Sequence, residues 1–194
     1  MHYYLESTEN ATIELFSAYE VAKGQWGDYA LHEGQWGNIY NHYKKSLGSD
    51  GVIDSERERI TKEMNNAKEL SEKYKKEAEI YDVTRRILAG SILQLAKQGL
   101  SIVFGQTINF PQEPKIEDIS VATIIFAGRN QSMHYEEGSY KNVTKSCFEA
   151  LAQLDSKFAL QNASGKNMSI EILDILGWDD YERYIATMED LLNR

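Results

Sequence analysis

The sequence contains a single cysteine, Cys147, among its 194 residues. One thiol cannot form an internal disulfide, and no metal site in this chain can be built from cysteines. Only two prolines are present, Pro111 and Pro114, and both fall in one short stretch. Because proline is the strongest helix breaker, the rest of the chain favours long uninterrupted helices. A reducing compartment, the cytoplasm, is the simplest location for such a protein.

Long apolar runs are also missing. No uninterrupted run approaches the roughly 20 apolar residues needed to cross a bilayer. Residues 1–7 lack the basic start and the apolar stretch of a signal peptide. Hydrophobic residues still make up 42% of the chain, which is enough for a core. We therefore expect a soluble cytoplasmic protein with no membrane partner, folded as one domain over residues 1–194.

Positive charge is scarce in this sequence. Lysine and arginine number 21 against 30 aspartates and glutamates, which gives a formal net charge of −9. The overall field of such a protein repels nucleic acid, so any contact with RNA has to use a local basic patch. The charged run 73–86 is the best candidate outside the motif described below. Its interleaved lysines and glutamates, however, favour a solvated helix face held by salt bridges.

The first segment, residues 1–53, predicts a helix followed by loops. The helix should end near Gly24, since glycine is the usual residue after a helix terminus. The sequence Gly-Gln-Trp-Gly then occurs twice, around Trp26 and Trp36. We expect these tryptophans to pin a loop and a short helix against the core, with a base-stacking platform as the alternative. A turn is predicted at 48–51.

The longest predicted helix covers residues 54–104. Residues 55–58 read as a capping box at its start, and apolar residues recur every seven positions beyond it. Its first half is dense in charge, so this half should project and pack against the N-terminal segment or a second copy. Its second half, 87–104, is apolar enough for the core, and Gly90 is a candidate break.

Residues 116–194 hold the remaining helical patterns. The segment 169–176 predicts a short helix, with a strand as the less favoured alternative. The others are expected over 116–127, after Gly138, and from Asp179 to Leu192. Together with the earlier segments, this predicts an all-α fold, a helical bundle with one long, partly projecting helix.

The segment 129–134, Arg-Asn-Gln-Ser-Met-His, holds the residues with the clearest chemistry. Cleaving RNA without a metal needs a base for the attacking 2′-hydroxyl, an acid for the leaving oxygen and a cation for the phosphoryl charge. Histidine suits proton transfer near neutral pH, and the planar guanidinium of arginine suits phosphoryl oxygens. Arg129 and His134 therefore supply a minimal set of groups for this reaction.

The spacing of the two residues adds a geometric constraint. Five positions along a helix correspond to about 500°, which leaves the two side chains about 140° apart. For both to reach one phosphate, we expect the helix to end or bend between Arg129 and His134, or two copies to contribute. Gly128 and the segment 136–138 would permit such a break.

Arg129-Asn130-x-x-x-His134 resembles the R-x4–6-H motif of HEPN-domain proteins, in its common form with a polar residue after the arginine. The all-α setting, with helices before and after the motif, is similar too. The resemblance implies a four- or five-helix bundle that dimerises with two motifs facing across one cleft. It also implies a metal-independent endoribonuclease without a cofactor, of the type found among prokaryotic toxins and anti-phage defence proteins.

By position, the resemblance assigns Arg129 to the scissile phosphate, His134 to acid–base chemistry and Asn130 to a polar supporting role. The implied partners are an RNA substrate, a second copy of the chain, and an antitoxin or regulatory protein. In family toxins paired with a nucleotidyltransferase antitoxin, a tyrosine often stands two residues after the histidine. Here Glu136 occupies that position and Tyr135 follows the histidine directly, which departs from that subgroup.

Two other interpretations stay open. The chain could be a catalytically inactive HEPN-like module that binds RNA or nucleotides or regulates a partner. It could also be a helical interaction protein in which the motif is a helix terminus, and Arg129 would then be engaged only with its own helix. Under the ribonuclease interpretation, two further residues, Ser132 and Tyr135, are candidates for substrate binding.

Overall fold

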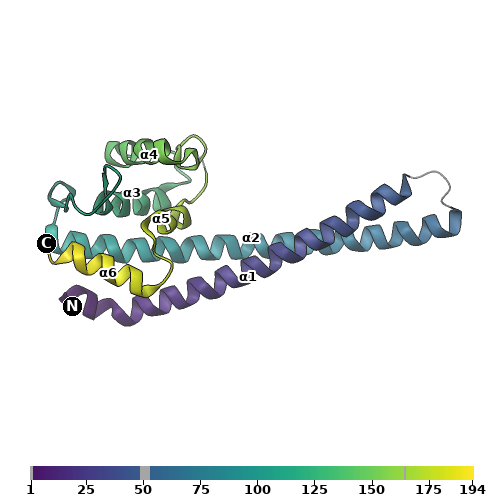
Figure 1. Cartoon of the computed structure of the whole chain (residues 1–194), viewed down its shortest axis with the longest axis horizontal. Coiled ribbons are helices and arrows are strands. Elements are labelled where there is room, and N and C mark those ends of the chain that lie inside the picture. Colours follow the sequence, from purple (N-terminus) through teal and green to yellow (C-terminus); the bar gives the residue numbers. More distant parts are fainter. Residues whose placement is uncertain (1, 49–52, 164) are drawn as a thin grey trace. The chain divides into compact units, whose positions relative to one another are not determined.

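The computed structural model describes residues 2–48, 53–163 and 165–194, and 79% of the chain is helical (Figure 1). The mostly helical class is thus confirmed. The described α-helices are α1 (Tyr3–Leu47), α2 (Asp54–Phe104), α3 (Val121–His134), α4 (Asn142–Leu154), α5 (Ser169–Leu176) and α6 (Tyr181–Leu192). Shorter elements are the 3-10 turns η1 (Thr107–Asn109) and η2 (Ser156–Phe158) and the strands β1 (Lys115–Ile116) and β2 (Ile119–Ser120).

By their contacts, the residues form two compact units. Unit 1 comprises Met1–Tyr19 and Arg85–Arg194, and unit 2 comprises Glu20–Thr84. Helices α1 and α2 contribute to both units, because each continues through a unit boundary. The motif and all the helices that follow α2 belong to unit 1.

Unit 2 is an antiparallel pair of helices formed by the later part of α1 and the earlier part of α2 (Figure 1). Aromatic rings line the seam between them. Tyr29 stacks on Tyr81 with ring centroids 5.5 Å apart, and His32 stacks on Tyr74 at 5.0 Å. The charged first half of α2 therefore packs against the N-terminal helix of its own chain, one of the two partners predicted for it.

The prediction of loops around the two tryptophans is wrong. Helix α1 passes through Gly24, Trp26 and Trp36 without interruption and ends at Leu47. Glycine weakens a helix by only about 1 kcal/mol relative to alanine, and tertiary packing along a long seam outweighs that cost. The chain therefore has two long helices, of 45 and 51 residues, where the sequence predicted one. Residues 49–51 of the predicted turn lie outside the described residues.

Replacing Gly34 in α1 by alanine is expected to stabilise the protein. A Cβ atom at this position would meet no atom within 4 Å, so the substitution adds helix propensity without a clash. We expect a gain of roughly 0.5–1 kcal/mol in the free energy of unfolding, measured by urea denaturation. Gly177 is the matched control, because its φ of +67° should make alanine destabilising. A loss of stability on substituting Gly34 would contradict a helix through residues 24–37.

Helix α2 differs from its prediction in two details. It begins at Asp54, so the residues expected to form a capping box lie within the first turn. It also passes Gly90 without a break. A Cβ at this buried glycine would lie 3.4 Å from the Ser132 hydroxyl oxygen. Gly90 therefore packs against Ser132 of α3 and does not interrupt the helix.

One stretch of α2 is more apolar than a count of uninterrupted apolar residues indicates. An 18-residue window has a mean hydropathy of 1.4, and 39% of it is buried. By length and composition such a window could cross a membrane, but the core helix of a soluble protein passes the same test. This window is therefore only weak evidence, both for a membrane-spanning helix and for the core helix of a soluble protein.

Unit 1 is built around the apolar second half of α2. The start of α1 is fixed to it by Tyr4, whose hydroxyl donates to the Leu95 carbonyl at 2.7 Å. Helix α3 packs against α4 and α5, and Phe16 of α1 contacts Tyr184 of α6 with ring centroids 5.7 Å apart. The fully buried core residues include Ile92, Leu93, Leu100, Ile124, Ile125, Phe148, Leu151, Ile172, Met188 and Leu191.

The helix leading into the motif starts later than the predicted 116–127. Ile116 and Ile119 pair across a two-stranded antiparallel turn, and α3 begins only at Val121. The start is fixed by Ser120, whose hydroxyl accepts a hydrogen bond from the Thr123 amide at 3.2 Å. The helix then runs through the motif to its end at His134.

The remaining helices follow the predicted order. Helix α4 begins at Asn142, four residues after Gly138, and α5 is a helix over the expected range. The last helix is capped by Asp180, whose carboxylate accepts from the Arg183 amide at 2.8 Å. The helix therefore begins at Tyr181, two residues after the predicted start at Asp179.

Candidate functional site

All six motif residues lie on the last turns of α3 in unit 1. Helix α3 continues from Arg129 to His134, so the expected end of the helix between them is not found, whereas the alternative that two copies contribute stays a prediction. Both side chains nevertheless line one cavity of about 590 Å³. The cavity is lined by Lys97 of α2, Phe126, Arg129, Asn130 and His134 of α3, and Glu137, Ser139, Tyr140, Lys141 and Thr144 beyond it.

The helical wheel explains how two residues on different faces share a cavity. With 100° per residue and Arg129 at 0°, Phe126 lies at about 60°, Asn130 at about 100° and His134 at about 140°. The cavity therefore lies along this arc of the helix surface. The arginine and the histidine stand at its two edges, with an aromatic and an amide side chain between them. The side chains of Arg129 and His134 therefore both reach the cavity, although they point about 140° apart on a continuous helix.

The cavity is a local exception to the negative charge of the chain. Three cationic side chains line it, Lys97, Arg129 and Lys141, against one carboxylate, Glu137. Among the described residues, no carboxylate forms an ion pair with any of these three cations. This is the kind of local basic patch that an acidic protein needs in order to hold a phosphate.

Sequence reasoning missed Lys97, although the sequence carried a signal for it. It is the only charged residue between Arg86 and the end of α2 at Phe104. A lone lysine within a buried apolar helix destabilises the fold unless its ammonium group reaches water or a ligand. The lysine is half-buried and reaches the cavity that the motif lines.

The Arg129 guanidinium is oriented by two amide side chains. Its Nε donates to Gln94 Oε1 on α2, and one terminal nitrogen donates to Asn130 Oδ1 at 3.1 Å. Because one partner lies on another helix, Arg129 is not engaged only with its own helix. The interpretation of the motif as a simple helix terminus predicted the opposite. The neutral partners leave the positive charge of Arg129 uncompensated.

His134 is the last residue of α3 and its side chain is 47% exposed. Its Nδ1 lies 2.7 Å from Glu137 Oε1. A carboxylate at this position can accept a hydrogen bond from Nδ1–H, and this contact orients the imidazole ring. Nε2 is then the ring nitrogen that can exchange a proton with a ligand.

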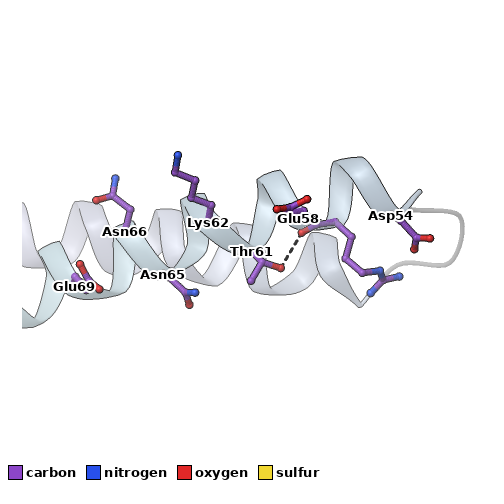
Figure 2. A pocket seen from close by; sticks show the side chains of 8 residues that line it. Asp54, Glu58, Thr61, Lys62, Asn65, Asn66 and Glu69 are labelled. Atoms are coloured by element: carbon purple, nitrogen blue, oxygen red, sulfur yellow. Dashed lines mark hydrogen bonds between the residues drawn. The ribbon is translucent and has the colours of Figure 1, made fainter.

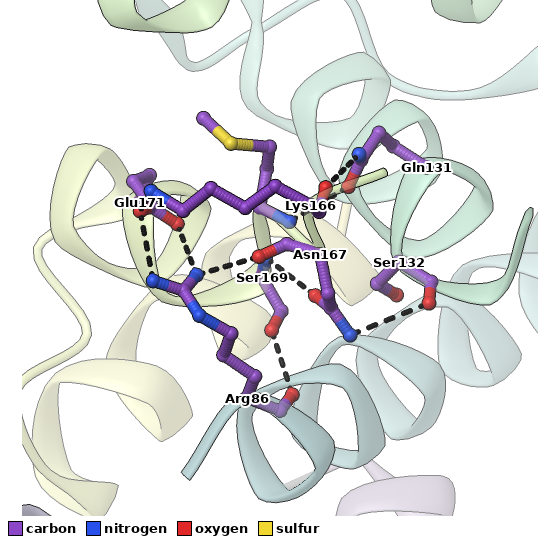
Figure 3. A network of polar contacts seen from close by, with 8 residues as sticks. Arg86, Gln131, Ser132, Lys166, Asn167, Ser169 and Glu171 are labelled. Atoms are coloured by element: carbon purple, nitrogen blue, oxygen red, sulfur yellow. Dashed lines mark hydrogen bonds and ion pairs between the residues drawn. The ribbon is translucent and has the colours of Figure 1, made fainter. Parts of the chain in front are cut away.

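Gln131 and Ser132 face the core and are absent from the cavity lining. Gln131 is fully buried, donating to the Lys166 carbonyl at 2.7 Å and accepting from the Met168 amide at 2.8 Å (Figure 3). Ser132 donates to the Arg129 carbonyl at 2.9 Å, and its own carbonyl accepts from Asn167. These residues fix the end of α3 to the loop before α5.

Tyr135, the other candidate for substrate binding, is the C-terminal capping residue of α3 and does not line the cavity. The structure therefore brings together Arg129, Asn130 and His134, and leaves Ser132 and Tyr135 outside that group. The other lining residues come from α2, from Phe126 of α3, from the segment 137–141 between α3 and α4, and from Thr144 of α4.

A buried ion pair supports the loop that Gln131 holds. Arg86 of α2 donates to Glu171 of α5 at 2.8 Å and to the Asn167 carbonyl (Figure 3). The two charged side chains are only 12% and 13% exposed. Burial alone would raise the pKa of Glu171, but hydrogen bonds from Arg86 and Lys166 outweigh it and lower that pKa below 4.5. The sequence predicted that Arg86 lies on a solvated charged face, but its side chain is buried in this ion pair.

Burial raises the pKa of both Tyr140 and Cys147. Burial, with a smaller effect from the Glu137 charge, raises the pKa of Tyr140, although the Gln131 side chain lowers it. The tyrosine hydroxyl in the cavity is thus protonated at neutral pH and can donate a hydrogen bond. Burial raises the pKa of the Cys147 thiol to about 12, so this core cysteine remains an unreactive thiol.

The described part of the chain contains no group of three or more histidine, cysteine, aspartate or glutamate residues that could hold a metal ion. A second cavity, of about 680 Å³, lies in unit 2 along the start of α2 (Figure 2). Arg57 and Lys62 in its lining are balanced by Asp54, Glu58 and Glu69. It has no histidine and no excess of positive charge, so it offers neither proton transfer nor a phosphate site.

Searches against protein-family models, curated proteins and solved structures found no match for this chain. The fold and site define a mostly helical protein with a cationic cavity at the end of a core helix.

Proposed function

We propose that this protein is a metal-independent endoribonuclease of the HEPN type. The observation that carries the proposal is that Arg129, Asn130 and His134 line one cavity together with Lys97 and Lys141. A histidine oriented by a carboxylate lies beside cations that no carboxylate neutralises among the described residues. These groups match what RNA cleavage through the 2′-hydroxyl requires.

In the proposed reaction, the scissile phosphate lies between Arg129 and His134. His134 Nε2 takes the proton of the 2′-hydroxyl, whose oxygen forms a bond to phosphorus while the bond to the 5′-oxygen breaks. Arg129 and the two lysines stabilise the negative charge that develops on the phosphoryl oxygens. The products are a 2′,3′-cyclic phosphate and a 5′-hydroxyl.

The leaving oxygen needs a proton from a second acid, and one histidine cannot serve both sides of phosphorus at once. A homodimer with facing motifs would supply that acid as a second copy of His134 in its protonated form, which gives the proton on its Nε2 to the 5′-oxygen. Apolar side chains beside the motif support this arrangement, since Met133 is 53% exposed and Val143 is 46% exposed. We further propose a cytoplasmic toxin or anti-phage defence effector, restrained by an antitoxin or regulatory protein.

The decisive experiment is a gel assay of the purified protein on total RNA and transfer RNA in EDTA. The protein carrying both Arg129→Ala and His134→Ala runs beside it as the matched control. We expect the wild type to cleave and the double variant to be inactive, because the reaction needs no metal. Loss of cleavage in EDTA, or equal cleavage by both proteins, would overturn the proposal.

A second candidate is a HEPN-like module that binds RNA or nucleotides without turnover. It is favoured by the same cationic cavity, combined with the presence of only one histidine in its lining. It predicts a gel shift with RNA that Arg129→Ala abolishes, with no cleavage products under any condition. Light scattering separates the two candidates further, since only the ribonuclease requires a second copy at the motif.

A further inference from the structure

A buried hydroxyl in unit 1 lacks a hydrogen-bond partner. Thr144, near the start of α4, is 1% exposed, and its Oγ1 has no partner within the described part of the protein. A buried hydroxyl that makes no hydrogen bond destabilises the fold, and native proteins rarely keep one without a reason. Valine has nearly the same shape and would avoid that cost, so the hydroxyl needs an explanation.

Thr144 lines the cavity that also contains Arg129 and His134. Its side chain is almost fully buried there. A ligand in the cavity can supply the missing partner, since a hydroxyl both donates and accepts. Threonine in a helix populates two χ1 rotamers, so rotation about χ1 alone can change the direction of Oγ1.

Two aromatic side chains, Phe126 and Tyr140, line the same cavity. Aromatic rings stack on nucleobases, and each stacked base contributes about 1–3 kcal/mol to binding. The cavity volume of about 590 Å³ falls in the range of roughly 300–1,000 Å³ that holds small ligands. A base can reach these rings and the buried hydroxyl only when it is unpaired.

We propose that the cavity holds one unpaired nucleobase beside the phosphate site and that the Thr144 hydroxyl reads its polar edge. Phe126 and Tyr140 supply the apolar contact, and Lys97 and Lys141 hold the attached phosphate. The choice of RNA as the ligand rests on the proposed ribonuclease function. The assignment of Thr144 as a specificity-determining residue rests on its orphan hydroxyl and its place in the cavity.

The test measures binding of the four ribonucleoside 5′-monophosphates by titration calorimetry. Wild type is compared with Thr144→Val, which removes only the hydroxyl, and with Thr144→Ser, which keeps it. We expect the wild type to prefer one base, Thr144→Val to bind that base about tenfold more weakly, and Thr144→Ser to retain the preference. The melting temperature of Thr144→Val should equal or exceed that of the wild type, which excludes misfolding as the cause.

Equal binding of all four nucleotides by the wild type, or no binding, would overturn the inference. So would an unchanged preference in Thr144→Val, because a purely structural threonine predicts that result. RNA cleavage by the same preparations separates the two proposals. Base-selective binding without RNA cleavage would refute only the ribonuclease, whereas cleavage with an unchanged Thr144→Val base preference would refute only the base subsite.

Discussion

Replacing His134 by alanine is expected to lower the rate of RNA cleavage by at least about a hundredfold. Proton transfer by a positioned side chain contributes roughly 10²- to 10⁴-fold to such rates. The side chain is 47% exposed at the end of α3, so its removal should leave the fold intact. The measurement is the initial rate of cleavage of a labelled RNA in EDTA, with circular dichroism as a check on folding.

Arg129→Ala should cause a loss of similar size for a different reason. In the proposed reaction, the arginine stabilises charge that develops on the phosphoryl oxygens, and removing such a donor costs roughly 10²- to 10³-fold in rate. Arg129→Lys should restore only part of the activity, because lysine lacks the planar pair of donors and the bond from Nε to Gln94.

The chain offers matched controls for both substitutions. His42 lies exposed on α1 in unit 2, and Arg183 is an exposed residue of α6 paired with Asp179. Alanine at either position should leave cleavage within about twofold of wild type, since surface substitutions of this kind change stability by only about 0.5 kcal/mol. Retained cleavage in His134→Ala would refute the assignment of His134 as the acid–base residue.

The sequence predicted the elements of unit 1 better than those of unit 2, because different signals fix them. In unit 1 the helical spacing of apolar residues acts locally, and each predicted helix overlaps an observed one, although α3 begins five residues later and ends seven residues later than predicted. In α1 the glycine at position 24 predicted a helix end, but the helix continues through it to Leu47. Aromatic packing such as Tyr29 on Tyr81 overrode the glycine signal, and that pairing spans 52 positions along the chain.

The site was predictable only where its residues are adjacent in sequence. Arg129, Asn130 and His134 belong to one motif and one helix, so their spacing identified them together. Lys97 and Thr144 reach the same cavity from α2 and α4, and no periodicity relates them to the motif. The unpaired Thr144 hydroxyl is visible only once the packing of α4 is known. Sequence reasoning could therefore name the candidate residues of the motif, but not the residues from other helices that line the same cavity.

Breaking the buried ion pair between Arg86 and Glu171 is expected to destabilise the fold most. Arg86→Met removes three hydrogen bonds and leaves a carboxylate that is only 13% exposed. Such a change costs about 3–5 kcal/mol, and we expect the lower end because Lys166 still contacts Glu171 at 2.7 Å. The measurement is the urea unfolding midpoint. Arg183→Met, which breaks only exposed pairs, should cost less than about 1 kcal/mol.

The same pair predicts how stability depends on pH. The pKa of Glu171 in the folded protein lies below 4.5, because the hydrogen bonds from Arg86 and Lys166 outweigh its burial. The folded protein therefore binds this proton less readily than the unfolded chain, so the stabilisation is present above about pH 4.5 and is lost as the pH falls through the lowered pKa. A variant carrying Arg86→Met and Glu171→Leu should recover much of the lost stability at pH 7 and lose less than wild type below pH 4.5. A parallel acid dependence in both proteins would show that Glu171 is not the group responsible. The ion pair would then serve to hold the loop against Gln131 without contributing to acid unfolding.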